Sequence, residues 1–319
     1  MLKIKNLILS FFVLVFFGNA NVVAQIAETV KTTPSVSDTT KALLWEITGK
    51  DLTKPSYLYG TIHMIPKQDF FLTDETKKAL AASQKVTFEV NMKDMTNPMA
   101  LMGVMMKAMM PNGTRLRDLV SNEDYALVKN RFDSIGMPLA MLERVKPMFL
   151  SAMVDGGGAG MNPMDNSEEA KANQKTVSYE FEIMNIAEKQ KKDFGGLETM
   201  AFQMGIFDSI PYKAQAEMLV KSIKGGAKEG NLEFAKMVEM YKSQDIESMS
   251  QMMSGDDTEG LGQYESMLIT TRNLNWIPLM AKSMKEKQTF FAVGAGHLGG
   301  KKGVVNLLRK EGYTVKPLK

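Results

Sequence analysis

The sequence has no cysteine and only two histidines among its 319 residues. The missing cysteine excludes disulfide bonds, thiolate zinc sites, cysteine nucleophiles and lipidation at a cysteine. P-loop, G-x-S-x-G and H-E-x-x-H motifs are also missing. The net charge of +3 is small and evenly dispersed, so it predicts no nucleic-acid partner. The chain must therefore rely on a buried core, and it is long enough to form one.

The N-terminus has the pattern of a secretory signal peptide over residues 1–24. A basic start, MLKIKN, precedes an apolar run over 7–17 and small residues before a predicted cleavage after Ala24. The run is too short for a comfortable membrane span, although an uncleaved anchor is the alternative. Residues 25–42 form a predicted polar linker, and the predicted domain, 43–319, has no further apolar run of membrane-spanning length. We therefore predict an exported protein, periplasmic or secreted, with no membrane span after cleavage.

Both histidines close the same short motif, G-x-x-H. The sequence GTIH at 60–63 ends one apolar run, and GAGH at 294–297 ends another. Imidazole is the commonest neutral metal ligand and titrates near neutral pH. Because motif and context repeat together, we predict one site built from two distant parts of the chain, with His63 and His297 as metal ligands. The alternative is two unrelated polar loop residues.

The segments around the two motifs have the same order of predicted elements. The first part contains predicted strands 43–47, 56–59 and 85–90 with a helix over 73–83, and the second contains strands 288–293 and 313–315 with a helix over 301–310. Each part thus includes a strand–GxxH–helix–strand unit. This repetition predicts a mixed α/β fold with both histidines at the carboxyl ends of strands, where such sheets bind ligands.

The part between the two units is predicted to be a long helical insertion within one domain. The candidate helices are 97–110, 121–134, 138–153, 168–192, 200–206, 211–224, 230–243, 245–253 and 257–286. A glycine-rich run at 156–160 predicts a flexible break between two of them.

A third ligand is needed, because two imidazoles alone hold a metal poorly. Glu89 ends the strand that follows the first motif, so we expect the sheet to bring it beside His63. There it would bind the metal or act as general base on a metal-bound water. The alternative is a solvated carboxylate at a strand end.

Two further charged residues are candidates for catalytic roles. Glu198 follows a glycine pair in the sequence GGLET and is either a second site carboxylate or a residue of a helix first turn. Arg272 interrupts an otherwise amphipathic segment. It would stabilise a developing oxyanion or pair with a carboxylate, and the alternative is an ordinary surface arginine.

Methionine is unusually frequent, with 28 residues, and many of them crowd residues 92–110 at near-helical spacing. Thioethers suit Cu(I), which suggests a copper-binding helix. The alternatives are an adaptable apolar filler and a permissive substrate groove, because methionine side chains are flexible and polarizable.

These motifs together resemble the TraB/GumN/Tiki family. The matching pieces are, in order, WEI at 45–47, YGTIH at 59–63, FEV at 88–90, SYE at 178–180, GLET at 196–199 with Gln203, RN at 272–273, and VGAGHL at 293–298 with Gly303. The resemblance implies a mixed α/β fold of the type shared with erythromycin esterases and a haem-binding lipoprotein. It also implies a metal-dependent hydrolase that uses manganese or cobalt, with zinc as a further candidate.

Carried over residue by residue, the resemblance makes His63, His297 and Glu89 the metal or catalytic set, supported by Glu198 and Arg272. The leading hypothesis is an exported metal-dependent peptidase that acts on a peptide or protein. In it, Arg272 stabilises the oxyanion and Glu198 orients a ligand or moves a proton. Two alternatives stay open: a non-catalytic binding protein for a peptide, haem or metal, and a copper buffer built on the methionine-rich helix.

Overall fold

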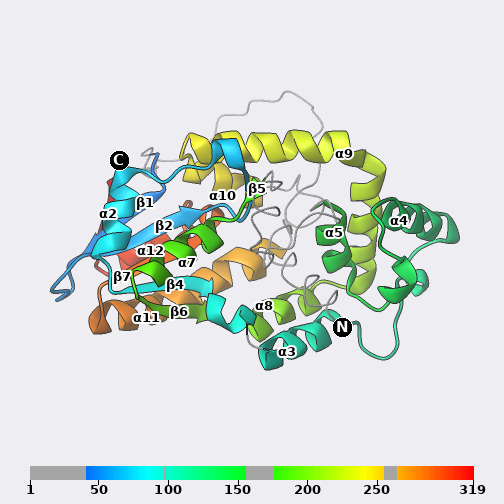
Figure 1. The fold of residues 1–319 in the computed structure, drawn as a ribbon, viewed down its shortest axis with the longest axis horizontal. Coiled ribbons are helices and arrows are strands. Elements are labelled where there is room, and N and C mark those ends of the chain that lie inside the picture. Colours follow the sequence, from blue (N-terminus) through cyan, green and yellow to red (C-terminus); the bar gives the residue numbers. More distant parts are fainter. Residues whose placement is uncertain (1–40, 97, 156–175, 255–263) are drawn as a thin grey trace, which may run out of the picture.

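The computed structural model describes residues 41–96, 98–155, 176–254 and 264–319. It has a sheet with flanking helices at one end and a group of helices at the other (Figure 1). The predicted signal peptide, nearly all of the predicted linker and the glycine-rich break lie outside the described residues. The division of the chain into these segments and one domain stays a prediction.

The sheet confirms the mixed α/β fold. Its order is β6 (Asp193–Glu198), β4 (Lys85–Val90), β7 (Thr289–Gly294), β2 (Ser56–Thr61), β1 (Leu44–Thr48) and β8 (Thr314–Leu318). The first four strands are parallel, and β1 is antiparallel to both of its neighbours. Strand β7 lies between β2 and β4, so the two predicted units interleave instead of lying side by side.

Helices cover both faces of this sheet. They are α2 (Asp74–Ala82) and α7 (Tyr179–Lys189) on one face, and α11 (Thr271–Glu286) and α12 (Val304–Lys310) on the other. Figure 1 shows α7 in front of the sheet and α12 behind it. This division follows from right-handed crossovers, because the chain moves in one direction from β2 to β4 to β6 and returns in the other through β7 to β8.

The second group (Figure 1) consists of α3 (Pro98–Ala108), α4 (Asn122–Ser134), α5 (Pro147–Asp155), α8 (Met200–Ile206) and α9 (Tyr212–Lys242). Helix α10 (Ile246–Ser254) instead packs against the turn Ala295–His297 that follows β7, and against α9. Helices α4 and α5 pack against α9, and α3 packs against α8. Two short strands, β3 (Ile65–Pro66) and β5 (Thr176–Val177), pair with each other apart from the main sheet.

Short helical turns connect these elements. The 3-10 turns are Lys67–Asp69, Met92–Thr96, Leu116–Asp118, Leu139–Met141, Phe207–Ser209 and Ala295–His297. A π-helical turn, Ser266–Thr270, leads directly into α11.

Two helix predictions differ from the structure because of proline and glycine. The predicted helices 211–224 and 230–243 are one helix, α9, because glycine weakens a helix by only about 1 kcal/mol and does not forbid it. Figure 1 shows that α9 bends along its length. The predicted helix 138–153 is instead a 3-10 turn followed by α5, since Pro147 is tolerated at a helix start but not inside.

Two other predicted helices are shorter than expected. The prediction 168–192 becomes β5 and then α7, which begins only at Tyr179, and residues 168–175 lie outside the described part. The prediction 257–286 becomes the π-helical turn and α11, and residues 257–263 are likewise outside the described part.

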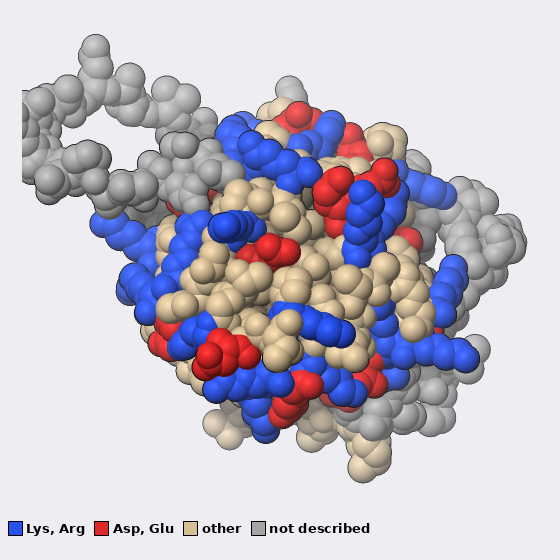
Figure 2. Space-filling model, turned by 90° about the vertical axis from the view of Figure 1, so that its left-hand side faces the viewer, with Lys and Arg blue, Asp and Glu red and all other residues tan. Residues whose placement is uncertain are grey.

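One cluster of buried apolar residues extends from Ala42 to Val315 and joins the first and last described segments. The pairing of β1 with β8 has the same effect. None of the described helices is long and apolar enough to cross a membrane. On the face in Figure 2, basic and acidic side chains are interspersed among uncharged residues. The prediction of no nucleic-acid partner stays a prediction.

Gly303 makes a close backbone approach that we expect to be essential for stability. A Cβ atom there would lie 2.0 Å from the carbonyl oxygen of Gly299 and 2.3 Å from that of Leu298. Because backbone must shift, we expect Gly303→Ala to lower the free energy of unfolding by about 3 kcal/mol, measured by denaturant titration. The control is Gly103→Ala in α3, whose Cβ would meet nothing within 4 Å. Equal stabilities of the two variants would contradict the prediction.

Candidate active site

The four predicted site residues near the sheet belong to neighbouring parallel strands. His63 follows β2, His297 follows β7, Glu89 lies in β4 and Glu198 ends β6. The register places the ends of β2 and β7 level with each other. Because parallel strands end at the same edge of a sheet, residues far apart in the sequence meet here. The expectation that both histidines lie at carboxyl ends of strands is confirmed.

His297 is buried and held by two neighbours. It closes the 3-10 turn after β7, and its side chain is 4% exposed. Its Nδ1 lies 2.6 Å from Oδ1 of Asn273, and its Nε2 lies 3.1 Å from Nη1 of Arg272. Burial, followed by the positive charge of Arg272, lowers the pKa of His297 to about 3. An arginine only donates, so Nε2 accepts and the proton of the neutral ring is on Nδ1.

Arg272 is the central cation of the site. It is the second residue of α11 and is buried. Its Nε donates to Oε1 of Glu198 at 3.0 Å, and its Nη1 donates to the carbonyl of Leu268 at 3.1 Å and to His297. Its Nη2 donates to Oε2 of Glu89 at 2.5 Å and to Oε2 of Glu198 at 3.0 Å. All five N–H groups of the guanidinium are therefore used.

Glu89 is held in its ionised form. Its Oε1 accepts from the backbone N–H of Gly294 at 2.8 Å, and its Oε2 accepts from Nε2 of Gln203 at 3.1 Å and from Arg272. Burial alone would raise the pKa of Glu89. The charge of Arg272 outweighs burial and holds this pKa well below its usual range. A carboxylate with these partners is a weak base at neutral pH.

Glu198 is the most enclosed carboxylate of the site, with a side chain that is 4% exposed. It accepts from Arg272, from Nε2 of Gln203 at 3.0 Å and from Nε1 of Trp276 at 2.8 Å. The sequence did not indicate which carboxylate Arg272 would pair with. The structure shows that Arg272 and Glu198 bind each other, which agrees with the expectation that Arg272 pairs with a carboxylate.

His63 belongs to a second group beside this centre. Its Nδ1 lies 2.9 Å from Oε1 of Glu180, which also accepts from Oγ1 of Thr61 at 2.7 Å. Its Nε2 makes no hydrogen bond to any described residue, and its side chain is 39% exposed. Burial lowers the pKa of His63, but the charge and hydrogen bond of Glu180 outweigh it and raise the pKa to about 9. His63 is therefore mainly an imidazolium at neutral pH.

Glu89 interacts electrostatically with both histidines, and it lies nearest to His297. Its Oε1 lies 4.0 Å from Nε2 of His297, because β7 lies between β2 and β4 and brings its own histidine against Glu89. The negative charge of Glu89 also raises the pKa of His63, and the charge of His63 lowers the pKa of Glu89.

Sequence reasoning assigned no role to Glu180, Gln203, Asn273 or Trp276. Glu180 lies in the first turn of α7, and its Oε2 accepts from Oγ of Ser178 at 3.0 Å. Glu180, Gln203 and Asn273 lie within the motifs that resemble the family, and this position was the only feature of the sequence that pointed to them. Their roles depend on contacts across the fold, which spacing along the chain does not show.

Comparison with known proteins shows the family of this chain. A model of the TraB/PrgY/gumN family matches residues 43–317. The chain belongs to this family. Its curated relatives include Metalloprotease TIKI2 of Danio rerio, 24% identical over 86% of this chain and 60% of the relative. Metalloprotease TIKI1 of Homo sapiens is 23% identical over 82% of this chain and 59% of the relative.

This TraB/PrgY/gumN member spans about three fifths of the length of the relatives that it matches. A third relative, the Metalloprotease TIKI homolog of Nematostella vectensis, is 23% identical over 84% of this chain and 65% of its own length. No solved structure matches the chain. The expected likeness to erythromycin esterases and a haem-binding lipoprotein therefore stays a prediction.

The names of the relatives imply a metal ion, for which His63, His297 and Glu89 are the predicted ligands. In the described parts of the chain, no group of three or more His, Asp and Glu side chains is arranged to hold one. Arg272 donates to Nε2 of His297 and to Oε2 of Glu89, so a guanidinium spans the place where an ion would bridge them. The arrangement does not fit an ion held by these three residues. The choice among manganese, cobalt and zinc stays a prediction.

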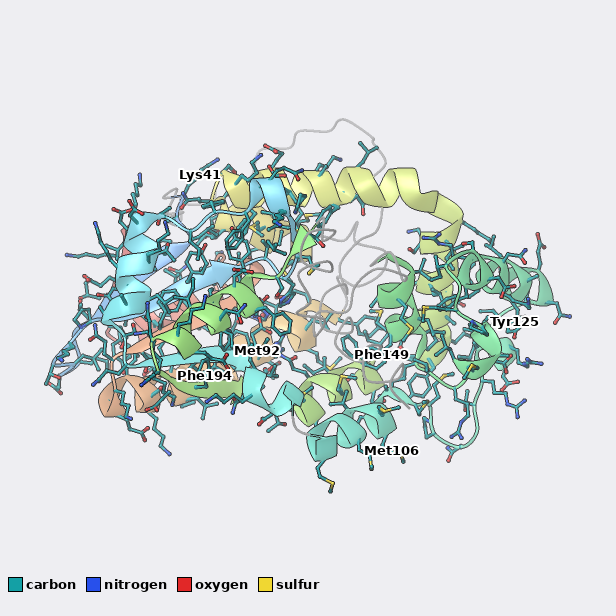
Figure 3. All side chains as sticks on the ribbon, in the orientation of Figure 1. Lys41, Met92, Met106, Tyr125, Phe149 and Phe194 are labelled. Carbon is teal, nitrogen blue, oxygen red and sulfur yellow. The ribbon has the colours of Figure 1, made fainter. Side chains whose placement is uncertain are left out.

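The methionine-rich helix α3 packs against α8 and exposes several of its thioether side chains. Met99, Met102 and Met106 are 76%, 61% and 73% exposed. Figure 3 shows Met106 on the outside of the helical group. The side chain of Met95 lies outside the described part. The copper-binding and substrate-groove readings of this helix stay predictions.

Proposed function

We propose that this chain is a hydrolase of peptide bonds, with His63 as its proton-transfer residue. The observation that carries the proposal is the environment of His63: Nδ1 is held by Glu180, while Nε2 is unengaged among the described residues on a partly exposed ring. This is the arrangement that general acid–base catalysis requires, because a carboxylate orients the ring and leaves one nitrogen for the substrate. The relatives named metalloproteases support the choice of peptide or protein substrates.

In the proposed reaction, His63 begins as the imidazolium that Glu180 stabilises. Water adds to the carbonyl carbon of the substrate, and the new C–O bond gives a tetrahedral intermediate. His63 donates its Nε2–H to the nitrogen of this intermediate as the C–N bond breaks, and the neutral ring then takes up the proton that the added water oxygen still carries. The proton that His63 loses is thus replaced, and the products are a carboxylic acid and an amine.

Arg272 has a positioning role in this proposal. All its N–H groups donate to protein atoms, so the predicted oxyanion contact would require one of these bonds to break. We propose that Arg272 holds Glu89, Glu198 and His297 at the strand ends, and through β7 keeps the loop beside His63 in place. Glu198 serves as its anchor.

We also propose that the protein is exported, to the periplasm or beyond the cell. The proposal rests on the basic and apolar pattern of residues 1–24. It is tested by N-terminal sequencing of the mature protein from an expressing cell, where a first residue of Gln25 is expected. An intact Met1 on the exported or cytosolic protein would contradict cleavage.

The hydrolase proposal is tested with purified protein and a mixed peptide library, with products identified by mass spectrometry. Each assay is run once with chelator and once with added Mn²⁺, Co²⁺ or Zn²⁺. We expect products from the wild type in at least one condition and none from His63→Gln. Saturable peptide binding without any product would favour the binding-protein alternative. Products of equal amount from His63→Gln would remove His63 from the reaction.

The pH dependence of the rate distinguishes the protonation state of His63. The proposed donor is the protonated ring, whose pKa is raised to about 9. We therefore expect kcat/KM to be level below about pH 9 and to fall above it, by about tenfold per pH unit. In Glu180→Gln the negative partner is lost, so the fall should move toward the ordinary histidine range near pH 6.5. A rate that rises through pH 9 would show that the neutral ring is the active form.

A further inference from the structure

The centre around Arg272 already contains a cation among metal-ligating side chains. Glu89, Glu198 and His297 all direct acceptor atoms at one guanidinium. Carboxylate oxygens and an imidazole nitrogen are also the donors that a divalent ion would use. The same acceptor atoms cannot serve both cations at once.

We propose that Arg272 is the resident cation of this centre, and that the protein does not hold a divalent metal ion between His297 and Glu89. The inference rests on the proposed function, because it describes the same site and identifies the group that supplies the positive charge there. It differs from the metal ion that the names of the relatives imply.

Several independent contacts hold the guanidinium in place. Its Cζ lies 5.0 Å from the ring centroid of Trp276, and the ring of His297 lies 4.5 Å from that of Trp276. The carbonyl of Leu268, one turn earlier in the chain, accepts from Nη1. A cation stacked on an aromatic ring and bound by two carboxylates is well desolvated and strongly fixed.

The acceptor that a metal would need from His297 is also fixed toward Arg272. Nδ1 of His297 is bound to Oδ1 of Asn273. The amide nitrogen of Asn273 donates to the carbonyls of His297 and Lys302, at 3.2 Å and 2.9 Å. This network sets the orientation of the ring, so its Nε2 can only face the guanidinium. Both histidines of the chain are in the described part, and no cysteine exists, so other residues supply no further imidazole or thiolate.

The arrangement makes a positive prediction as well as a negative one. Removing the guanidinium would leave two carboxylates and one imidazole directed at the same small space, which is a sufficient ligand set for a divalent ion. We therefore expect Arg272→Ala to acquire a metal site that the wild type lacks.

The test is equilibrium dialysis of the purified full chain at pH 7.5 against Mn²⁺, Co²⁺ or Zn²⁺, followed by elemental analysis. For the wild type we expect no stoichiometric ion that depends on His297. For Arg272→Ala we expect about one ion per chain, with an affinity at least tenfold higher than that of the wild type. We expect this binding to be lost again in Arg272→Ala/His297→Ala. A wild type that binds one ion per chain and loses it in His297→Asn or Glu89→Gln would overturn the proposal.

Arg117→Ala is the matched control. Arg117 also binds a glutamate: its Nε donates to both carboxylate oxygens of Glu143 at 2.9 Å, and its Nη2 donates to Oε1 of the same residue. No histidine adjoins that pair. This variant should gain no metal site. Circular dichroism shows whether Arg272→Ala is folded, and if it is not, the wild type compared with His297→Asn and Glu89→Gln decides the question.

The cleavage assay and the dialysis experiment distinguish failure of the proposed function from failure of the resident-cation proposal. If no condition yields peptide cleavage, the hydrolase proposal fails while the dialysis result still decides where the cation comes from. If cleavage occurs and chelator abolishes it, and an ion bound by His297 and Glu89 restores it, only the resident-cation proposal fails.

Discussion

Replacing His63 with glutamine should lower kcat/KM by about 10²- to 10⁴-fold without unfolding the protein. The size is that of removing a positioned general acid–base group. The fold should survive because the side chain is 39% exposed and its ring contributes to no buried cluster. Steady-state kinetics on a cleaved peptide measure the loss, and thermal unfolding measures the stability.

Glu180→Gln is the partner variant for this prediction. The amide keeps the shape of the side chain but not the charge that orients His63 and stabilises its imidazolium. We expect a smaller loss, of about 10- to 100-fold, together with the shift in the pH profile described above. Lys77→Gln, on the exposed surface of α2, should leave the rate unchanged. Equal activity of His63→Gln and Lys77→Gln would contradict the proposed role.

Replacing Arg272 with methionine should lower the free energy of unfolding by about 3–5 kcal/mol at pH 7. Methionine fills a similar volume, but it leaves Glu89 and Glu198 as buried charges without their partner. A buried charge without a counter-ion is much more costly than a missing surface pair. Denaturant titration of both proteins measures the difference.

The pH dependence of that difference follows from Glu89. In the wild type its pKa is depressed, so its contribution to stability is present above the unfolded pKa of about 4.5 and is lost as the pH falls toward the folded value. In Arg272→Met the buried carboxylate gains stability when it is protonated. The difference between the two proteins should therefore be largest near pH 7 and shrink toward pH 4. A constant difference would show that the ion pair is not its source.

Arg272→Lys separates charge from geometry in the same measurement. Lysine keeps a positive charge but cannot bind two carboxylates, an imidazole and a carbonyl through one planar fork. We expect its stability to lie between those of the wild type and Arg272→Met. A lysine variant as stable as the wild type would mean that the charge alone is sufficient.

Local patterns in the sequence were enough to predict most of the sheet. Strands β2, β4 and β7 have dense β-branched, aromatic or apolar residues between turn signals. The predicted bounds of β4 match the structure, and those of β2 and β7 differ from it by one or two residues. The N-terminus of α2 was readable because Thr73 accepts from the N–H of Thr76, as an N-cap residue does. Such signals act over a few residues, and the neighbouring sequence contains them completely.

The helices between β4 and β7 were harder to predict, because local signals do not include the packing that decides where a helix ends. Glycine at 225 and 226 and proline at 147 have local meanings, but packing decides whether a glycine ends a helix. Helix α9 continues through its glycines, with α4 and α5 packed along it. The sequence therefore predicted two helices where the structure has one.

The sequence by itself determined that both histidines follow strands and that Glu89 lies at the end of another. These features depend on the pattern of residues within single strands. Only the tertiary structure decided which groups bind each other. The insertion of β7 between β2 and β4 brought Glu89 to His297, and the packing of α7 brought Glu180 to His63. Burial of Arg272 among both carboxylates then decided the charge of the centre, because hydrogen bonds between distant elements exist only after the chain has folded.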